Sequence, residues 1–308
     1  MIVGELGPAQ LRQRLAGAGL LLRTGPVVSR LHTSLDAVWR GVALHYAAFP
    51  VEPDDAFADF HVEVRRPAGV RGWLKPQVVF LLDGEEPFAP LPGAQGFPML
   101  EWGLNWCIYT YCHQFMTLHS AVLERDGQAL LMPAPSGSGK STLCAGLAFR
   151  GWRLLSDELT VVDPTACEVV PVPRPISLKN RSIDVIRAFA PQAAFSPPVP
   201  DTIKGVVAHV RPPQDAVDKA AQRARPRWIV LPRFVAGEPA RLTPLPRAQA
   251  FMRLVENTFN YGIHGAAAFA TLAGLVDRCD CYSFTYGHLE EAMTVFDQLA
   301  ATSGEHVR

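Results

Sequence analysis

A glycine-rich segment that ends in a lysine and two hydroxyl residues is the part of this sequence best suited to chemistry. Residues 130–142 read LLMPAPSGSGKST, an apolar run followed by a tight loop. The loop fits the phosphate-binding pattern G-x-x-x-x-G-K-[ST], except that Ala134 replaces the first glycine. Gly137 and Gly139 can turn the backbone so that successive N–H groups point at phosphate oxygens. The segment therefore predicts an anion-binding loop between a strand and a helix.

The other residues of the loop have roles in binding a nucleotide. Lys140 can reach the β- and γ-phosphates, the hydroxyl of Ser141 can ligate Mg²⁺, and a helix that begins near Lys140 adds its positive end. A loop that matches by chance is the alternative, but the strand before it and the helix after it argue against chance. We expect ATP and Mg²⁺ as cofactors, with nucleotide contacts from the whole loop: Ala134, Pro135, Ser136, Gly137, Ser138, Gly139, Lys140, Ser141 and Thr142.

Two adjacent acids follow the loop helix. Residues 153–158 read RLLSDE, an apolar strand that ends in Asp157 and Glu158. The short return of the chain predicts that this strand lies beside the loop strand in a parallel sheet, with its carboxyl end at the phosphate crevice. One carboxylate can hold or orient the metal, and the other can accept a proton from an attacking hydroxyl. A solvated strand end is the alternative interpretation.

Further candidates are a histidine and three cations. His119 lies on an expected strand, where a lone histidine is more often structural than functional. Arg174, Lys179 and Arg211 lie in loops after expected strands. Phosphoryl transfer needs cations beyond one lysine, because charge on the transferred group must be balanced in the transition state. We therefore treat these three as possible phosphate or substrate contacts, with ordinary surface charge as the alternative.

The elements that must position these residues fall into two units. Residues 1–98 predict a smaller α+β domain, with a helix over 10–16 and strands over 57–64 and 78–82. Pro90, Pro92 and Pro98 indicate a boundary or linker. Residues 99–308 begin with a helix and continue with a hairpin turn at 125–127, the loop, and its helix over 140–149. The later elements expected are strands at 167–172, 228–231 and 282–286, loops at 173–180 and 212–226, and helices at 246–259, 266–278 and from 289.

Composition limits the function classes. The chain has 308 residues, 48% of them hydrophobic, with 29 basic and 29 acidic residues. The zero net charge disfavours binding to nucleic acid or to a membrane surface. We find no signal peptide and no segment apolar enough to span a membrane, and six cysteines are too few for a disulfide framework. These features predict reduced thiols and a cytoplasmic location.

The run from Leu118 to Val162 resembles the catalytic core of the HPr kinase/phosphorylase family. The matching motifs are HSAV at 119–122, APSGSGKS at 134–141 and RGWRLLSDE at 150–158. The whole chain resembles the HPr-kinase-related "A" group and is similar also to lasso-peptide serine kinases, through PRF at 232–234, LPRAQA at 245–250 and YGHL at 286–289. The resemblance implies a P-loop kinase core of the HPr-kinase/PEP-carboxykinase-like type, an α/β fold with a mixed sheet and flanking helices.

The resemblance also implies roles for single residues. Asp157 matches the family's proton acceptor, and His119 matches a histidine that lies near that acid and helps to set its charge. Glu158 stands where the family has a second aspartate, and its role is to assist the metal. The family's later metal-binding glutamate has no counterpart in residues 172–179, which read VPRPISLK. Metal binding then falls to Ser141 and Glu158, and phosphate handling to Arg174 or Lys179.

We therefore expect an ATP-dependent kinase that phosphorylates a hydroxyl, either a serine of a peptide or small protein or a small hydroxylated metabolite. Two alternatives stay open: a nucleotide-gated module that recognises a peptide or partner without transfer, and a simple ATPase. Residues 1–98 are assigned to acceptor recognition by elimination. The sequence leaves open the acceptor itself, homo-oligomer formation, and reverse phosphorylase or pyrophosphate-dependent activity.

Overall fold

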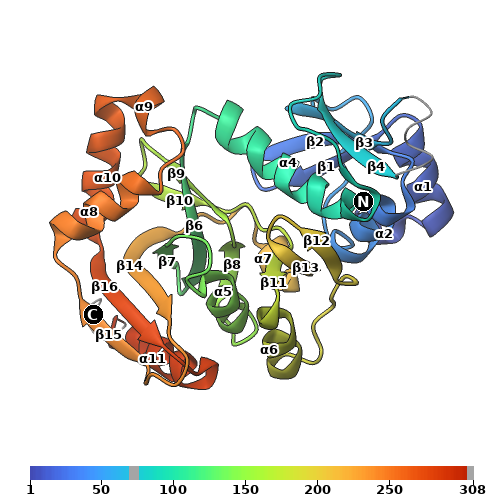
Figure 1. The fold of residues 1–308 in the computed structure, drawn as a ribbon. Helices are drawn as coiled ribbons and strands as arrows, with labels where there is room; N and C mark the ends of the chain where they lie inside the picture. The colour runs from blue at the N-terminus through green and yellow to red at the C-terminus, as the bar shows by residue number, and fades with distance from the viewer. Residues whose placement is uncertain (69–75, 304–308) are drawn as a thin grey trace.

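The computed structural model describes residues 1–68 and 76–303, and its amino-terminal part is built on a five-stranded sheet (Figure 1). The strand order is β1-β2-β3-β4-β5, in which only β2 and β3 are parallel. Side chains along β3 alternate between buried and more exposed, as the sequence predicted for a half-buried strand. The elements are η1 (Val3–Glu5), α1 (Pro8–Ala16), β1 (Leu20–Thr24), β2 (Val27–Thr33), α2 (Asp36–His45), β3 (Phe60–Arg65), β4 (Gln77–Leu82), β5 (Leu91–Pro92) and η2 (Gly93–Gln95).

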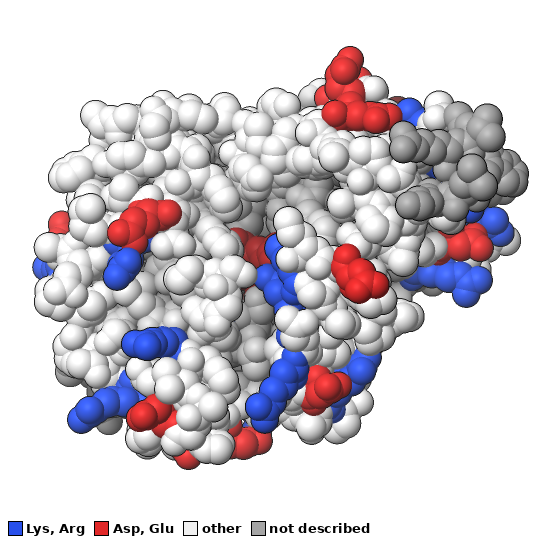
Figure 2. Space-filling view, viewed as in Figure 1, with Lys and Arg blue, Asp and Glu red and all other residues white. Residues whose placement is uncertain are grey.

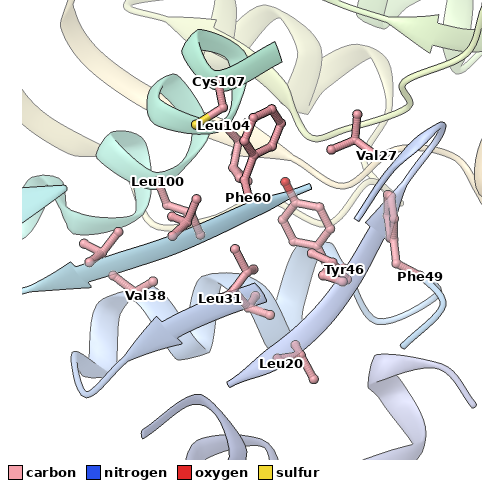
Figure 3. Packing of buried hydrophobic residues seen from close by; sticks show 14 of the residues in the cluster. Leu20, Val27, Leu31, Val38, Tyr46, Phe49, Phe60, Leu100, Leu104 and Cys107 are labelled. Atoms are coloured by element: carbon pink, nitrogen blue, oxygen red, sulfur yellow. The ribbon is translucent and has the colours of Figure 1, made fainter. Parts of the chain in front are cut away.

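Helix α4 (Gly96–Tyr111) packs against this first sheet, although the sequence assigned its start to the second unit. Figure 3 shows Leu100 and Leu104 of α4 in the same packed cluster as Leu31 and Phe60 of the sheet. Pro98 lies in the first turn of α4, where backbone N–H groups have no partner within the helix. That proline therefore belongs to a helix start and not to a linker.

The second sheet has eight strands and carries the candidate loop. Its order is β10-β9-β6-β7-β14-β16-β15, and β8 pairs with β6 outside this path. Strand β14 is parallel to both β7 and β16, and the other pairs are antiparallel. This mixed sheet confirms the expected α/β class. The strands are β6 (Met116–Arg125), β7 (Gln128–Pro133), β8 (Arg153–Ser156), β9 (Leu159–Asp163), β10 (Glu168–Val170), β14 (Arg225–Phe234), β15 (Arg241–Pro244) and β16 (Asp280–Tyr286).

Helices cover both faces of the eight-stranded sheet. Neighbouring residues of β14 point to opposite faces, so that Trp228 joins one buried cluster and Ile229 another. The first cluster includes Leu143 of α5 and Phe296 of α11, and the second includes Leu272 of α10. The helices are α5 (Lys140–Ala148), α6 (Arg181–Phe189), α7 (Gln214–Asp218), α8 (Arg247–Glu256), α9 (Tyr261–His264), α10 (Ala266–Arg278) and α11 (Leu289–Ser303).

A third, three-stranded sheet lies beside α5 and α6, with the order β11-β13-β12. Its strands are β11 (Ile176–Lys179), β12 (Val199–Thr202) and β13 (Gly205–Val210). The loop predicted over 173–180 is therefore wrong for Ile176–Lys179. The prolines that suggested a loop precede the strand, while Ile176 and Leu178 are buried with α5 and α6. The loop predicted over 212–226 likewise contains α7 and the start of β14.

The prediction that β8 lies directly beside the loop strand β7 is wrong, because β6 lies between them. The hairpin partner β6 occupies one edge of β7, and the parallel strand β14 occupies the other. Strand β8 pairs instead with the far edge of β6. Since β6 is antiparallel to both strands, β7 and β8 still run in the same direction. Their carboxyl ends therefore lie at the same end of the sheet, as the sequence analysis required.

The uncharged segment 102–123 divides between α4 and β6. Within residues 1–68 and 76–303, none of the helices is long and apolar enough to cross a membrane. All six cysteines are buried and free.

Candidate functional site

The glycine-rich loop connects β7 to α5 and has the conformation that its glycines predicted. Gly137 and Gly139 have φ angles of +87° and +89°. A Cβ on Gly139 would lie 2.5 Å from the hydroxyl oxygen of Tyr286 and 2.8 Å from Cβ of Phe234, so only glycine fits there. Ala134 is buried and is not among the residues with positive φ, so its methyl group costs no backbone strain.

The ends of β14 and β16 anchor the loop. The N–H of Phe234 donates to the carbonyl of Ser138 at 2.8 Å. The hydroxyl of Tyr286 donates to the carbonyl of Gly139, also at 2.8 Å. The N–H of Leu143 bonds to that same Gly139 carbonyl at 3.0 Å, and the N–H groups before it in α5 have no partner within the helix. Carbonyls of the loop thus face the sheet, while the first turn of α5 offers donors to an anion.

A cavity of about 710 Å³ opens above this loop. Figure 2 shows a hollow near the middle of the face, with acidic atoms on its floor and basic side chains along one edge. One wall comes from the ends of β14 and β16, and the opposite wall from β11, α6 and the β12–β13 turn. The first wall holds Phe234, Tyr286, Gly287, His288 and Leu289, and the second holds Ser177, Lys179, Asn180, Arg181, Ser182, Val185, Ile203 and Lys204.

Lys140 lines this cavity at the start of α5. Its ammonium group donates to the carbonyl of Ala134 at 3.3 Å. Burial lowers the pKa of Lys140 to about 8, although the charges of Asp157 and Glu158 act to raise it. A bound phosphate would also raise this pKa, because a negative charge favours the charged form of the lysine. The loop therefore presents a desolvated cation that gains from an anionic ligand.

Asp157 and Glu158 follow β8 and have different environments. Oδ2 of Asp157 accepts a hydrogen bond from the N–H of Ser177 at 3.0 Å, while its buried Oδ1 has no hydrogen-bond partner within the described ranges. Burial and the neighbouring charge of Glu158 raise the pKa of Asp157 to about 6. Burial acts in the same direction on Glu158, but the nearby charges of Lys204, Lys179 and Lys140 with His119 together lower the pKa of Glu158. The pair therefore holds one weak acid beside one carboxylate that stays ionised.

The two acids also differ in position. Glu158 lines the large cavity, where its Oε1 lies 3.5 Å from the ammonium of Lys204. Asp157 lines a second, much smaller cavity behind the first. It lies just behind the wall of the large cavity, since its partner Ser177 lines both cavities.

His119 projects from β6 into the large cavity. Burial and the nearby charge of Lys140 together lower the pKa of His119 to about 4. The imidazole is therefore neutral at neutral pH. The structure thus brings His119, Lys140, Glu158 and Lys179 together along one cavity, as the sequence analysis expected, with Asp157 directly behind them.

Two of the expected phosphate contacts lie elsewhere. Arg174 is buried against α4, where its guanidinium pairs with Glu101 at 2.7 Å. The guanidinium of Arg211 donates to the carbonyl of Leu44 at the end of α2. Neither arginine lines the large cavity. Both use their charge to hold the amino-terminal elements against the rest of the chain.

The sequence analysis missed two cations that line the cavity, Lys204 and Arg181. Lys204 lies in the turn between β12 and β13, 25 residues beyond Lys179 in the chain. No local motif surrounds it, and only the pairing of β13 with β11 brings it to the site. Its ammonium also lies 5.2 Å from the centre of the Trp102 ring.

The residues fit a magnesium nucleotide better than a metal held by protein alone. In the described part of the chain, no three histidine, cysteine or acidic side chains gather into a metal cage. Mg²⁺ is usually bound by one or two carboxylates together with substrate phosphates and water. Ser141 and Glu158 both line the cavity, and the unpartnered Oδ1 of Asp157 is a further acceptor close to it. This donor set suits Mg²⁺ only when a phosphate completes it.

Comparison with known proteins adds no assignment. No protein-family model matches this chain, and no curated protein matches it. The resemblance to the HPr kinase/phosphorylase family therefore remains an interpretation of the motif residues. The geometry of the cavity is therefore the basis on which a function can be proposed.

Proposed function

We propose that this protein is an ATP- and Mg²⁺-dependent kinase that transfers the γ-phosphate to a hydroxyl group. The observation that carries the proposal is one cavity that joins an anion-binding loop to Glu158 and to added cations, with Asp157 just behind its wall. Lys140 and the first turn of α5 bind phosphate, while Asp157 and Glu158 lie where the terminal phosphate would end. Lys179 and Lys204 supply the further positive charge that phosphoryl transfer requires.

The two walls of the cavity favour one orientation of the nucleotide. Phe234 is 47% exposed and offers an aromatic surface at one end, with the buried ring of Tyr286 behind it at a centre-to-centre distance of 5.5 Å. Lys179, Arg181 and Lys204 make the opposite wall basic. An aromatic base packs well on the first wall, and polyphosphate is attracted to the second. We therefore place the base beside Phe234, with the γ-phosphate near Glu158.

In this orientation the acid pair divides the chemistry. Asp157, with a pKa near 6, is ionised at neutral pH and basic enough to accept the proton of the acceptor hydroxyl. The hydroxyl oxygen forms a bond to the γ-phosphorus, the bond from that phosphorus to the β–γ bridging oxygen breaks, and ADP leaves. Bound Mg²⁺ would neutralise charge on the β- and γ-phosphates, with Ser141 and Glu158 as its protein ligands. Lys140 and Lys179 stabilise the charge that develops on the transferred group.

The acceptor is proposed to be a serine of a peptide or small protein, with a hydroxylated metabolite as the second class. One observation favours a binding module without transfer: β11 and the residues before it supply no acid where the resembling family has a metal-binding glutamate. Such a module would bind the nucleotide and leave it intact.

A transfer assay separates these functions. Purified protein is incubated with Mg²⁺, γ-labelled ATP and pools of peptides, small proteins and hydroxylated metabolites. The kinase account predicts label on one acceptor class, at least a hundredfold loss in Lys140→Ala, and a similar loss in Asp157→Asn with nucleotide still bound. Label transfer at the wild-type rate in either variant contradicts the assignment. Release of free phosphate without acceptor indicates an ATPase, and binding without turnover indicates the module.

A further inference from the structure

The carboxylate of Glu158 is held from behind by a residue of α4. The side-chain amide of Asn105 donates from Nδ2 to Oε2 of Glu158 at 3.0 Å. The amide oxygen of Asn105 accepts a hydrogen bond from Nη1 of Arg174 at 2.8 Å. A guanidinium can only donate, so the amide oxygen has to face Arg174 and the NH₂ group has to face Glu158. The donor and acceptor roles of these two partners thus fix the orientation of the Asn105 amide.

Arg174 is fixed in turn by buried groups of the amino-terminal part. Nη2 of Arg174 lies 2.7 Å from both the carboxylate and the backbone carbonyl of Glu101. The hydroxyl of Tyr46 donates to the other carboxylate oxygen of Glu101 at 2.6 Å. The side chains of Arg174 and Glu101 are only 6% and 5% exposed. A continuous buried network therefore runs from the end of α2, through α4, to the acid in the cavity.

The two oxygens of Glu158 have separate partners. Asn105 holds Oε2 from α4, and Lys204 approaches Oε1 from the β12–β13 turn at 3.5 Å. The contact with Asn105 is shorter, and it leaves Oε1 directed toward the side where Lys204 lines the cavity. Residues that orient a metal ligand from behind in this way commonly change metal affinity about 10- to 100-fold when replaced.

We propose that Asn105 is a positioning residue, which holds Oε2 of Glu158 so that Oε1, on the side of Lys204, can bind Mg²⁺ beside the nucleotide. The amino-terminal part of the chain is then a component of the active site and not only a separate recognition unit. This inference rests on the proposed function, because it requires a magnesium nucleotide in the cavity. Asn105 does not touch the ligand and acts only through Glu158.

The test compares nucleotide affinity with and without magnesium. A non-hydrolysable ATP analogue with a β,γ-imido bridge is titrated into full-length protein by calorimetry, once with Mg²⁺ and once with EDTA. Asn105→Leu keeps the branching and the number of side-chain heavy atoms and removes both hydrogen bonds. Asn105→Ser is the second variant, for use if the leucine variant does not fold. Asn257→Leu is the matched control, because among the described residues that side-chain amide bonds to the carbonyl of Arg253 alone.

We expect Mg²⁺ to strengthen binding to the wild type and to the control, and this gain to fall about tenfold in the Asn105 variants. Affinity in EDTA should be unchanged, whereas general damage to the cavity would weaken both titrations. A full Mg²⁺ gain in the Asn105 variants, or equal losses with Mg²⁺ and with EDTA, would overturn the inference while the proposed function stands. Absence of nucleotide binding by the wild type would overturn both, so the two failures are distinguishable.

Discussion

Asp157 is buried, and one of its oxygens has no hydrogen-bond partner in the described structure, although buried polar atoms in folded proteins usually have one. Such a group destabilises the folded state when it is ionised. The arrangement is reasonable for a residue that has to exchange a proton with a substrate, because burial brings its pKa to about 6, near working pH.

This environment predicts that Asp157→Asn makes the protein more stable while it removes transfer. The pKa of Asp157 is raised from its ordinary value of 3.8 to about 6, so the folded state pays a penalty for the ionised acid. That penalty is absent below about pH 4 and complete above about pH 6. Two pKa units correspond to about 3 kcal/mol at most, and we expect a gain of about 1–3 kcal/mol at pH 7.5.

Urea unfolding of wild type and Asp157→Asn at pH 7.5 and at pH 4 measures this difference. The gain should be present at pH 7.5 and should nearly vanish at pH 4. A variant that is less stable than the wild type at pH 7.5 would show that the Asp157 carboxylate is paired in solution, contrary to its environment described above.

At the scale of elements, the loop depends on one glycine more than on the other. Both glycines need positive φ, but the described residues leave space for a Cβ at Gly137, whereas at Gly139 it would collide with Tyr286 and Phe234. We expect Gly137→Ala to cost about 1 kcal/mol of stability through backbone strain alone. Gly139→Ala should cost more and should displace the start of α5, so that nucleotide affinity falls at least tenfold.

Thermal unfolding and calorimetric titration with a nucleotide test this pair of variants. Equal effects of the two substitutions on affinity would show that the anchors from β14 and β16 do not determine the shape of the loop.

The sequence was sufficient to predict the turns and loops whose conformation is determined by residues adjacent in the chain. The turn at 125–127 forms because Asp126 and Gly127 both adopt positive φ, as a two-residue hairpin turn requires. The loop and α5 followed from the spacing of glycines and lysine. The place of β8 did not follow, because strand order depends on which edges are free in the assembled sheet. Lys204 and Asn105 reach the site only through pairing between distant segments, which no local pattern records.

At the scale of the whole molecule, a buried ion pair helps to join the amino-terminal part to the rest. Arg174 and Glu101 are both nearly inaccessible, and the charge of each is compensated by the other. Removing one partner leaves an uncompensated buried charge, which typically costs about 3–5 kcal/mol. We therefore expect Arg174→Met alone to destabilise the protein by that amount. The double variant Arg174→Met with Glu101→Leu should recover part of the loss, because the Asn105 amide oxygen and the Tyr46 hydroxyl still lose a partner.

Denaturant unfolding of the two single variants and the double variant measures this coupling. Losses in the single variants that simply add in the double variant would show that the pair is not coupled. The exposed pair of Arg12 and Asp36 gives a control, and Arg12→Met should change stability far less than Arg174→Met.

We propose that one cavity binds a magnesium nucleotide through Lys140 and the start of α5. Isothermal titration calorimetry of the full chain with Mg²⁺ and non-hydrolysable analogues of ATP and GTP measures this binding directly. The account predicts one binding site for the ATP analogue and an affinity at least tenfold weaker in Lys140→Ala, whose fold is checked by circular dichroism. Folded wild-type protein that gives no binding heat with either analogue at several temperatures would contradict the account.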